Sequence, residues 1–242
     1  EMIRAMDCVC VLNGDAPFID AATLRASLDH HIRTGADVTV ITAEIADPTG
    51  YGRIIRKNGA FCAIREQKDC SPDEAKISEV NSGAYWFNSQ KLSYYLPKLS
   101  TNNASGEYYL TDCVELAGKR EAFISVNPKI VLGANTRKAL LELNTIARNE
   151  MIEKHLDNGV SFISTDGIVI GADVKIGCDT TIYPNTVILG KTEIGEGCTI
   201  GANCHIENCT IGNNVRFDNV QAYNSVVEEN VKVGPFAQLR PG

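Results

Sequence analysis

Hydrophobic residues in the second half of the chain return at every sixth position. A small or β-branched side chain stands four residues after each of them, and glycine often follows directly, as at Gly177 and Gly195. The repeated residue is isoleucine at Ile170, Ile176, Ile182, Ile188, Ile194, Ile200 and Ile206. Neither a helix nor a hairpin has a period of six, whereas the hexapeptide repeat of a parallel β-helix does. We therefore predict short strands with two inward side chains per repeat, and glycines at corners that need a positive φ.

The repeat continues to the end of the chain with slips in its spacing. Its small inward positions run from Val174 to Thr210 and include Cys198 and Cys204. The later large inward residues are predicted to be Ile211, Phe217, Tyr223, Val227, Val233 and Leu239. Because the pattern still runs at Gly242, we expect a β-helix over residues 161–242 that is incomplete at its C-terminus.

The first half of the chain alternates apolar runs with helical spacing, which is typical of an α/β domain. An apolar strand over residues 7–12 precedes a helix that Asp20 caps and Gly35 ends, and a second strand covers residues 38–45. The apolar face of this helix is predicted to be Leu24, Leu28 and Ile32. The order strand, helix, strand indicates part of a Rossmann-like sheet.

Turn signals divide the remainder of this domain. Asn58 and Gly59 mark a hairpin turn, and residues 67–76 are polar enough to predict a mobile loop. The expected elements are strands over 51–55, 61–66, 79–87 and 130–132, and helices over 90–99, 109–118 and 136–156. The chain is thus predicted to hold a partial α/β domain over residues 1–135 and a linker helix over 136–160, followed by the β-helix.

Composition narrows the class of protein. A net charge of −7, without clustered Lys and Arg, argues against a nucleic-acid-binding face. No apolar run reaches the length of a membrane span and no signal segment begins the chain, which predicts a cytoplasmic protein. Nine cysteines without paired CxxC spacing predict reduced, structural thiols. His30, His31, His155 and His205 have no partner pattern, so we read them as structural or exposed.

Candidate chemistry lies at the strand ends of the α/β domain. Asp15 comes just after the first strand, where ligands bind to parallel sheets. Asn81, at the polar start of another strand, projects toward the same region as Glu66. Three structural alternatives stand beside these roles: Asp15 as a turn residue, Asn81 and Glu66 as solvated strand ends, and Asn135 as the cap of the linker helix.

Six motifs, taken together and in this order, resemble one family. They are Leu12-Asn13-Gly14-Asp15-Ala16-Pro17, Tyr51-Gly52-Arg53-Ile54, Glu66-Gln67-Lys68-Asp69, Val80-Asn81-Ser82-Gly83, Gly106-Glu107-Tyr108-Tyr109-Leu110-Thr111-Asp112 and Gly133-Ala134-Asn135-Thr136-Arg137. The chain resembles the bacterial bifunctional N-acetylglucosamine-1-phosphate uridylyltransferases and glucosamine-1-phosphate acetyltransferases along essentially its whole length. The resemblance implies a nucleotidyltransferase domain followed by a left-handed parallel β-helix, assembly as a homotrimer, and synthesis of UDP-N-acetylglucosamine for peptidoglycan and other cell-envelope precursors.

The resemblance also implies roles for single residues. Asp15 would be catalytic, and Asp15 and Asn135 would hold Mg²⁺, which prefers oxygen ligands. The implied substrate-binding residues are Asn13, Gly14, Gly52, Glu66, Asn81, Asn135 and Arg240. Gly52 would offer its backbone to the sugar, while Glu66 and Asn81 would bond its hydroxyl and acetamido groups. Arg240 would contact the acetyl acceptor, although Gln238 stands where the family commonly has a basic residue.

The implied substrates are UTP and N-acetylglucosamine-1-phosphate, which give UDP-N-acetylglucosamine, and acetyl-coenzyme A and glucosamine-1-phosphate for the second reaction. The family's glycine-rich triphosphate loop would precede Asp15, and its acetyltransferase histidine would follow Gly242, so we expect this chain by itself to catalyse neither reaction. Two alternatives stay open. One is a monofunctional sugar-1-phosphate nucleotidyltransferase with a β-helix for assembly, and the other is a non-catalytic trimerising scaffold.

Overall fold

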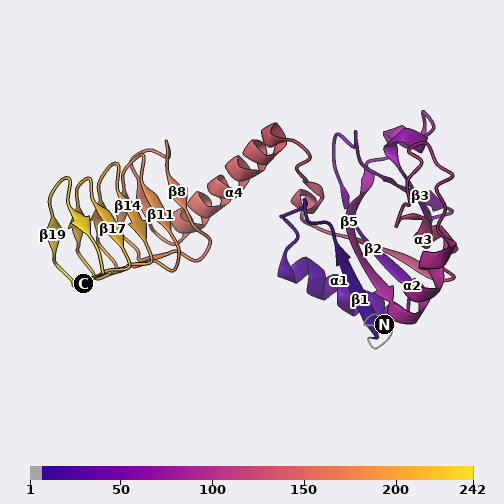
Figure 1. Cartoon of the computed structure of the whole chain (residues 1–242), viewed down its shortest axis with the longest axis horizontal. Coiled ribbons are helices and arrows are strands. Elements are labelled where there is room, and N and C mark those ends of the chain that lie inside the picture. Colours follow the sequence, from indigo (N-terminus) through magenta and orange to yellow (C-terminus); the bar gives the residue numbers. More distant parts are fainter. Residues whose placement is uncertain (1–6, 242) are drawn as a thin grey trace. The chain divides into compact units, whose positions relative to one another are not determined.

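The computed structural model describes residues 7–241 and divides into two compact units, residues 1–140 and 141–242 (Figure 1). The first unit is a mixed sheet with helices, and the second is a parallel β-helix that follows most of a long helix. Each unit has its own buried apolar clusters. None of the helices within residues 7–241 combines the length and the apolar composition that a bilayer crossing requires.

Six strands form the sheet of the first unit, in the order β4-β3-β5-β2-β6, with β1 paired to β5. Their bounds are β1 Cys8–Leu12, β2 Val38–Glu44, β3 Arg53–Lys57, β4 Ala60–Arg65, β5 Glu79–Asn88 and β6 Arg120–Ile124. Strand β5 runs antiparallel to β1, β2 and β3, whereas β2 runs parallel to β6. The long strand that carries Asn81 therefore lies inside the sheet, with neighbours on both sides.

The helix α1 (Ala21–Thr34) begins and ends as predicted, but it buries a different face. Thr23 N donates to the Asp20 side chain at 2.7 Å, and Gly35 has a left-handed φ of 59°. Ile32, predicted to be inside, is 64% exposed. The buried residues are Thr23, Ser27 and His31.

Hydrogen bonds explain why α1 buries polar residues. The His31 imidazole lies 2.8 Å from the Thr39 hydroxyl of β2, and Trp86 Nε1 donates to the Ser27 hydroxyl at 3.0 Å. These hydrogen bonds offset the cost of burying polar groups between the helix and the sheet. Hydrophobic spacing alone could not reveal this face.

One predicted strand of the first unit was wrong, and the predicted polar loop contains short turns. The strand expected at 130–132 is a 3₁₀ turn, η5 (Pro128–Val131), and the strand β6 lies earlier, with its polar residues at the sheet edge. The loop expected at 67–76 contains the 3₁₀ turns η2 (Gln67–Asp69) and η3 (Glu74–Lys76). The guanidinium of Arg53, a residue only 1% exposed, donates to Gln67 Oε1 and to the Ala75 carbonyl, so a buried cation orders this segment.

Two short helices and a 3₁₀ turn complete the first unit, and one long helix follows it. They are α2 (Ser89–Tyr95), η4 (Leu96–Lys98), α3 (Asp112–Leu116) and α4 (Arg137–Asp157). Ala139 N donates to Thr136 Oγ1 at 3.1 Å, so Thr136 rather than Asn135 caps α4. Ile152 of α4 belongs to the apolar core of the β-helix. His155, three residues later, is also buried, which agrees with the structural role predicted for it.

Fourteen short strands within residues 161–239 form the β-helix in three parallel sheets. Their bounds are β7 Ser161–Phe162, β8 Val169–Ile170, β9 Lys175–Ile176, β10 Thr181–Ile182, β11 Val187–Leu189, β12 Glu193–Ile194, β13 Thr199–Ile200, β14 His205–Glu207, β15 Thr210–Ile211, β16 Arg216–Phe217, β17 Gln221–Tyr223, β18 Val226–Val227, β19 Lys232–Val233 and β20 Gln238–Leu239. Like residues stack in register, as Ile182 pairs with Ile200 and Ile188 with Ile206. The predicted parallel β-helix is confirmed.

The predicted positive φ was wrong for the glycines that follow the inward isoleucines, although other glycines of the β-helix have it. Gly177 and Gly195 do not have a positive φ. A Cβ at Gly177 would lie 2.7 Å from the backbone of Gly195 and Glu196, so this glycine permits the next coil to stack closely. The positive φ values fall instead on three other glycines, on Phe236, and on one aspartate and seven asparagines: Gly167, Gly190, Gly197, Phe236, Asp179, Asn185, Asn203, Asn208, Asn214, Asn219, Asn224 and Asn230. Asparagine tolerates this conformation better than most residues.

The spacing slips also move two inward positions. Cys209 is 1% exposed in place of the predicted Thr210, and Ala222 is fully buried in place of Tyr223. Ala222 pairs with Ile206 of the preceding coil, which places it in the inward column. A coil that drops one residue shifts every later side chain by one position, so the period of six fails locally. Cys198 and Cys204 are buried, as predicted.

Candidate functional site

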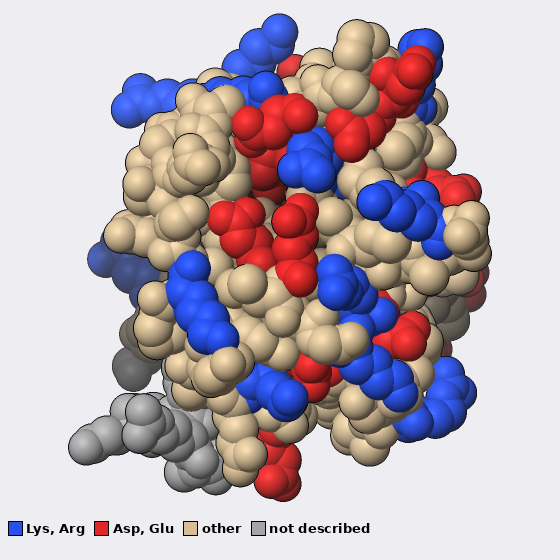
Figure 2. Space-filling model, turned by 90° about the vertical axis from the view of Figure 1, so that its right-hand side faces the viewer, with Lys and Arg blue, Asp and Glu red and all other residues tan. Residues whose placement is uncertain are grey.

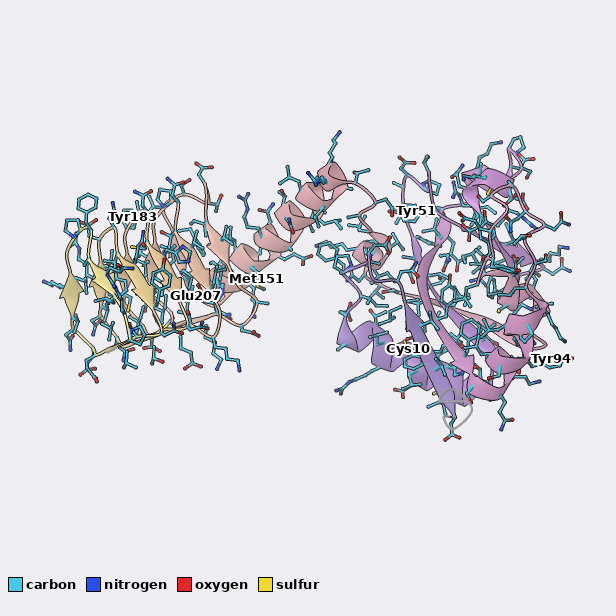
Figure 3. All side chains as sticks on the ribbon, viewed as in Figure 1. Cys10, Tyr51, Tyr94, Met151, Tyr183 and Glu207 are labelled. Carbon is cyan, nitrogen blue, oxygen red and sulfur yellow. The ribbon has the colours of Figure 1, made fainter. Side chains whose placement is uncertain are left out.

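A polar cavity of about 480 Å³ opens in the first unit and collects most of the predicted site residues. Its lining comes from segments far apart in the sequence: the loop after β1, the turn before β3, the end of β4, the start of β5, the loop before α3 and the loop after η5. The predicted residues among them are Asn13, Asp15, Gly52, Glu66, Asn81 and Asn135. Tyr51, labelled in Figure 3, is another lining residue.

Two predicted residues lie outside this cavity. Gly14 is exposed and is not a lining residue, although both of its neighbours in the chain are. Arg240 lies in the second unit, beside Gln238 and Leu239, at a different cavity of about 750 Å³. The structure therefore does not bring Arg240 together with the others.

Asp15 is held against the loop that carries Asn135. Ala134 N donates to the Asp15 carbonyl at 3.1 Å, which joins the two loops. A Cβ at Gly133 would lie 3.3 Å from that carbonyl and 3.8 Å from the carboxylate, so glycine lets the loop pass close to Asp15. The Asn135 side chain, freed from helix capping, is exposed at the cavity. The Asp15 carboxylate and the Asn135 amide oxygen therefore lie on adjoining loops, where both could bind a metal ion.

A bulge in β5 positions Asn81 and Asn13. Pairing with β2 slips between Ile41 and Thr42, so Ser82 and Gly83 lie outside the regular ladder. Gly83 has a φ of 76°, and a Cβ there would overlap the Asn13 amide. Position 83 therefore requires glycine for two reasons, its backbone conformation and the close approach of Asn13.

Glu66 lies against a glycine and a threonine. Both carboxylate oxygens would be 3.4 Å from a Cβ at Gly52, and Thr111 Oγ1 donates to Glu66 Oε1 at 3.1 Å. Burial raises the pKa of Glu66, and the nearby Asp69 and Asp112 raise it further, against the opposing effect of the Thr111 hydrogen bond. The carboxylate is thus desolvated and ready to accept hydrogen bonds from a ligand.

Acidic residues also surround this end of the cavity. An adjoining hollow of about 260 Å³ shares Glu66, Tyr109 and Thr111 and adds Asp69 and Asp112. Figure 2 shows acidic side chains gathered in the middle of one face of the first unit, with Lys and Arg around them. An anionic ligand would need a cation to offset this charge.

The residues at the cavity fit a magnesium ion better than a zinc ion. Within residues 7–241, no three His, Cys, Asp or Glu side chains converge as metal ligands. The Asp15 carboxylate and the Asn135 amide could supply two hard oxygen ligands, and phosphate and water would complete an octahedron, which is the usual pattern for Mg²⁺. Zinc would need a fuller set of nitrogen or sulfur ligands.

Three residues at the cavity had no role assigned from the sequence. Gly83 and Thr111 fall inside recognised motifs, so their contacts with Asn13 and Glu66 could have been suspected there. Tyr85 follows Gly83 in an apolar strand, where a tyrosine reads as core, and it is only 3% exposed. Only the tertiary structure shows that Tyr85 borders the cavity.

The fold joins an α/β domain to a parallel β-helix, and a family model matches each of these two parts. A family model described as "Nucleotidyl transferase" matches residues 1–129, and one described as "Bacterial transferase hexapeptide (six repeats)" matches residues 173–208 and 191–219. The first match covers more than half of the chain. The chain belongs to the nucleotidyl transferase family.

Curated relatives match along the whole chain. It is 44% identical over 246 residues to "Bifunctional protein GlmU" of Caldanaerobacter subterraneus subsp. tengcongensis, covering 100% of this chain and 54% of the relative. The proteins of the same name from Clostridioides difficile and Thermoanaerobacter pseudethanolicus are 43% and 42% identical, covering 100% and 96% of this chain and 54% and 52% of the relatives. The chain spans about half the length of these relatives.

Proposed function

We propose that the first unit carries the Mg²⁺-dependent site of an N-acetylglucosamine-1-phosphate uridylyltransferase. In this reaction a phosphate oxygen of the sugar phosphate attacks the α-phosphorus of UTP, and the bond to the departing pyrophosphate breaks. The observation that supports it most is the single cavity in which Asn13, Asp15, Gly52, Glu66 and Asn81 meet. These residues come from separate segments, and a solvated strand end would not need such convergence.

The residues divide the work between metal and sugar. Asp15 and Asn135 would hold Mg²⁺, which when bound offsets the negative charge of the phosphates as the α-phosphorus reacts. Glu66 and Asn81 would bond the sugar hydroxyl and acetamido groups, while Gly52 leaves room for the sugar beside its backbone. Asn13, fixed against Gly83, would contact the nucleotide sugar together with the backbone at Gly14. Positioning of this kind supplies much of the rate in phosphoryl transfer.

The proposal extends to the longer protein that the relatives' name describes as bifunctional. There the β-helix would take part in acetyl transfer from acetyl-coenzyme A to glucosamine-1-phosphate, with Arg240 near the acetyl acceptor. Both substrates of each reaction are cytoplasmic metabolites, so we place the protein in the cytoplasm. We also propose a partial nucleotidyltransferase domain over residues 1–135, a linker helix over 136–160 and a β-helix over 161–242.

Calorimetric titration of UDP-N-acetylglucosamine, with and without Mg²⁺, tests the site in this chain. We expect Mg²⁺ to tighten binding, and Asp15→Ala to remove that gain. The matched control is Asp29→Ala, which removes an exposed carboxylate on α1. In an enzyme that also has the triphosphate loop, Asp15→Ala should lower uridylyl transfer at least about 100-fold, the scale of losing one strong electrostatic contact, and leave acetyl transfer unchanged. If the wild-type chain failed to bind the nucleotide sugar, the proposed function would be wrong.

A further inference from the structure

Tyr85 is a buried tyrosine whose hydroxyl borders the proposed sugar site. It lies on β5, only 3% exposed, with its ring packed against Phe87 at a centroid distance of 5.8 Å. Its hydroxyl accepts a hydrogen bond from Asn81 at 2.6 Å, and the negative charge of Glu66 contributes to raising its pKa. Burial raises the pKa of Tyr85 strongly, so the phenol keeps its proton at any physiological pH.

The direction of the hydrogen bonds around Asn81 is fixed by chemistry. The backbone N–H of Gly83 can only donate, and it meets Asn81 at 3.0 Å, so this end of the amide must be the oxygen. The other end is then the amide nitrogen, which can only donate. Tyr85 therefore accepts from Asn81, and its own O–H proton is not used in that bond.

The phenolic proton has no protein acceptor among residues 7–241. Glu66, whose charge acts on Tyr85, accepts a hydrogen bond from Thr111 and is not hydrogen-bonded to the phenol. A buried O–H without an acceptor costs free energy, and phenylalanine would fill the same apolar space without that cost. Packing therefore does not explain why this position carries a hydroxyl group. An acceptor for the phenolic proton could lie in the cavity that Tyr85 borders.

We propose that the Tyr85 hydroxyl donates a hydrogen bond to a hydroxyl oxygen of the bound sugar, and that this sugar hydroxyl in turn donates a hydrogen bond to the Glu66 carboxylate. A hydroxyl group both accepts and donates, so it alone satisfies a phenol on one side and a carboxylate on the other. Tyr85 would then be a specificity-determining residue that selects a sugar hydroxyl at this position. This inference rests on the proposed function and names a contact within the same site.

The test compares Tyr85→Phe with the wild-type chain in calorimetric titrations of UDP-N-acetylglucosamine and of its monodeoxy analogues. Loss of one neutral hydrogen bond should weaken binding of the parent ligand about tenfold. One monodeoxy analogue, lacking the hydroxyl in question, should bind both proteins equally well. Tyr95→Phe is the matched control, since Tyr95 is equally buried and its hydroxyl donates to Asp37 at 3.0 Å, and it should leave the affinity unchanged. Thermal unfolding checks that all variants fold.

Each other result has a distinct meaning. Equal affinity of Tyr85→Phe and wild type for the parent ligand would overturn the inference and leave the proposed function standing. A loss of the same size for every analogue would show that Tyr85 acts only by orienting Asn81, which also overturns the contact proposed here. If the wild-type chain bound none of the ligands, the proposed function and this inference would both be wrong.

Discussion

At the scale of single residues, the candidate site depends on glycines that let polar side chains come close to the backbone. Gly52 faces the Glu66 carboxylate, and Gly83 faces the Asn13 amide. Side chains at these positions would push both polar groups away from the cavity. The consequence for Glu66 is electrostatic as well as steric, because a carboxylate held in this way is partly removed from water.

The pKa of Glu66 gives ligand binding a pH dependence of known sign. Burial raises this pKa above the ordinary value of 4.5, with Asp69 and Asp112 adding to the shift. The ionised form is therefore less stable in the folded chain than in the unfolded chain, a cost that is absent below 4.5 and complete above the raised pKa. A sugar hydroxyl donates to the ionised carboxylate, so binding requires the form that burial disfavours.

We therefore expect the affinity for UDP-N-acetylglucosamine to fall as the pH is lowered through the raised pKa of Glu66, before an ordinary glutamate would protonate. Glu66→Gln should bind more weakly at neutral pH and lose this pH dependence. Glu107→Gln, at an exposed position, should keep the wild-type profile. Calorimetric titrations at a series of pH values measure this. A profile that Glu66→Gln shares with the wild type would assign the titration to another group.

At the scale of elements, the β-helix is held by repeated contacts between one coil and the next. Thr180 Oγ1 accepts from Cys198 N at 3.0 Å and donates to the Gly195 carbonyl at 2.8 Å, so an inward hydroxyl satisfies backbone groups of the next coil. Glycines after the inward isoleucines bring the coils close enough for these bonds. The contribution of these glycines to stability differs from one coil to another, because the space around each glycine differs.

Gly177 and Gly171 occupy the same place in the repeat and make a matched pair of sites. A Cβ at Gly177 would lie 2.7 Å from backbone atoms, whereas one at Gly171 would lie at an ordinary 3.5 Å. Gly177→Ala should lower the free energy of unfolding by about 1–3 kcal/mol, the usual cost of overpacking. Gly171→Ala should change it little. Denaturant unfolding, together with amide hydrogen exchange in the β-helix, gives the comparison. Equal destabilisation by both variants would contradict the close-stacking role of Gly177.

At the scale of the whole molecule, the two units have separate cores and separate chemistry. The β-helix carries apolar side chains on its outside, among them Ile163, Val226 and Phe236, which are 61%, 74% and 84% exposed. Tyr183 and Glu207 also lie outside the coils (Figure 3). Exposed apolar side chains mark a surface that contacts another protein where they form one contiguous patch.

We predict that these surfaces join three copies of the chain. Association would cover the exposed apolar side chains and extend the parallel coils into a bundle. Light scattering should then give a particle of three times 26.3 kDa. Val226→Asp, which places a charge on the outer face without touching the inward column, should shift the particle toward the monomer. A clean monomer for the wild-type chain would contradict this assembly.

The sequence by itself determined the parts of this protein that repeat or that lie close together in the chain. The six-residue period fixed the β-helix, since each repeat buries the same two positions, and Asp20 and Gly35 fixed the ends of α1 through local hydrogen bonds and φ. The recognised motifs also indicated which polar residues to expect at one site.

The tertiary structure decided what depends on contacts between distant segments. The buried face of α1 depends on polar partners on β2 and β5. The glycines after the inward isoleucines are required by the close approach of the next coil, and Cys209 and Ala222 point inward because a dropped residue shifts the register. The backbone N–H of Gly83, which fixes the direction of the hydrogen bond between Asn81 and Tyr85, lies in a bulge opposite Ile41. Such contacts arise only when segments far apart in the chain pack together, so no spacing along the sequence contains them.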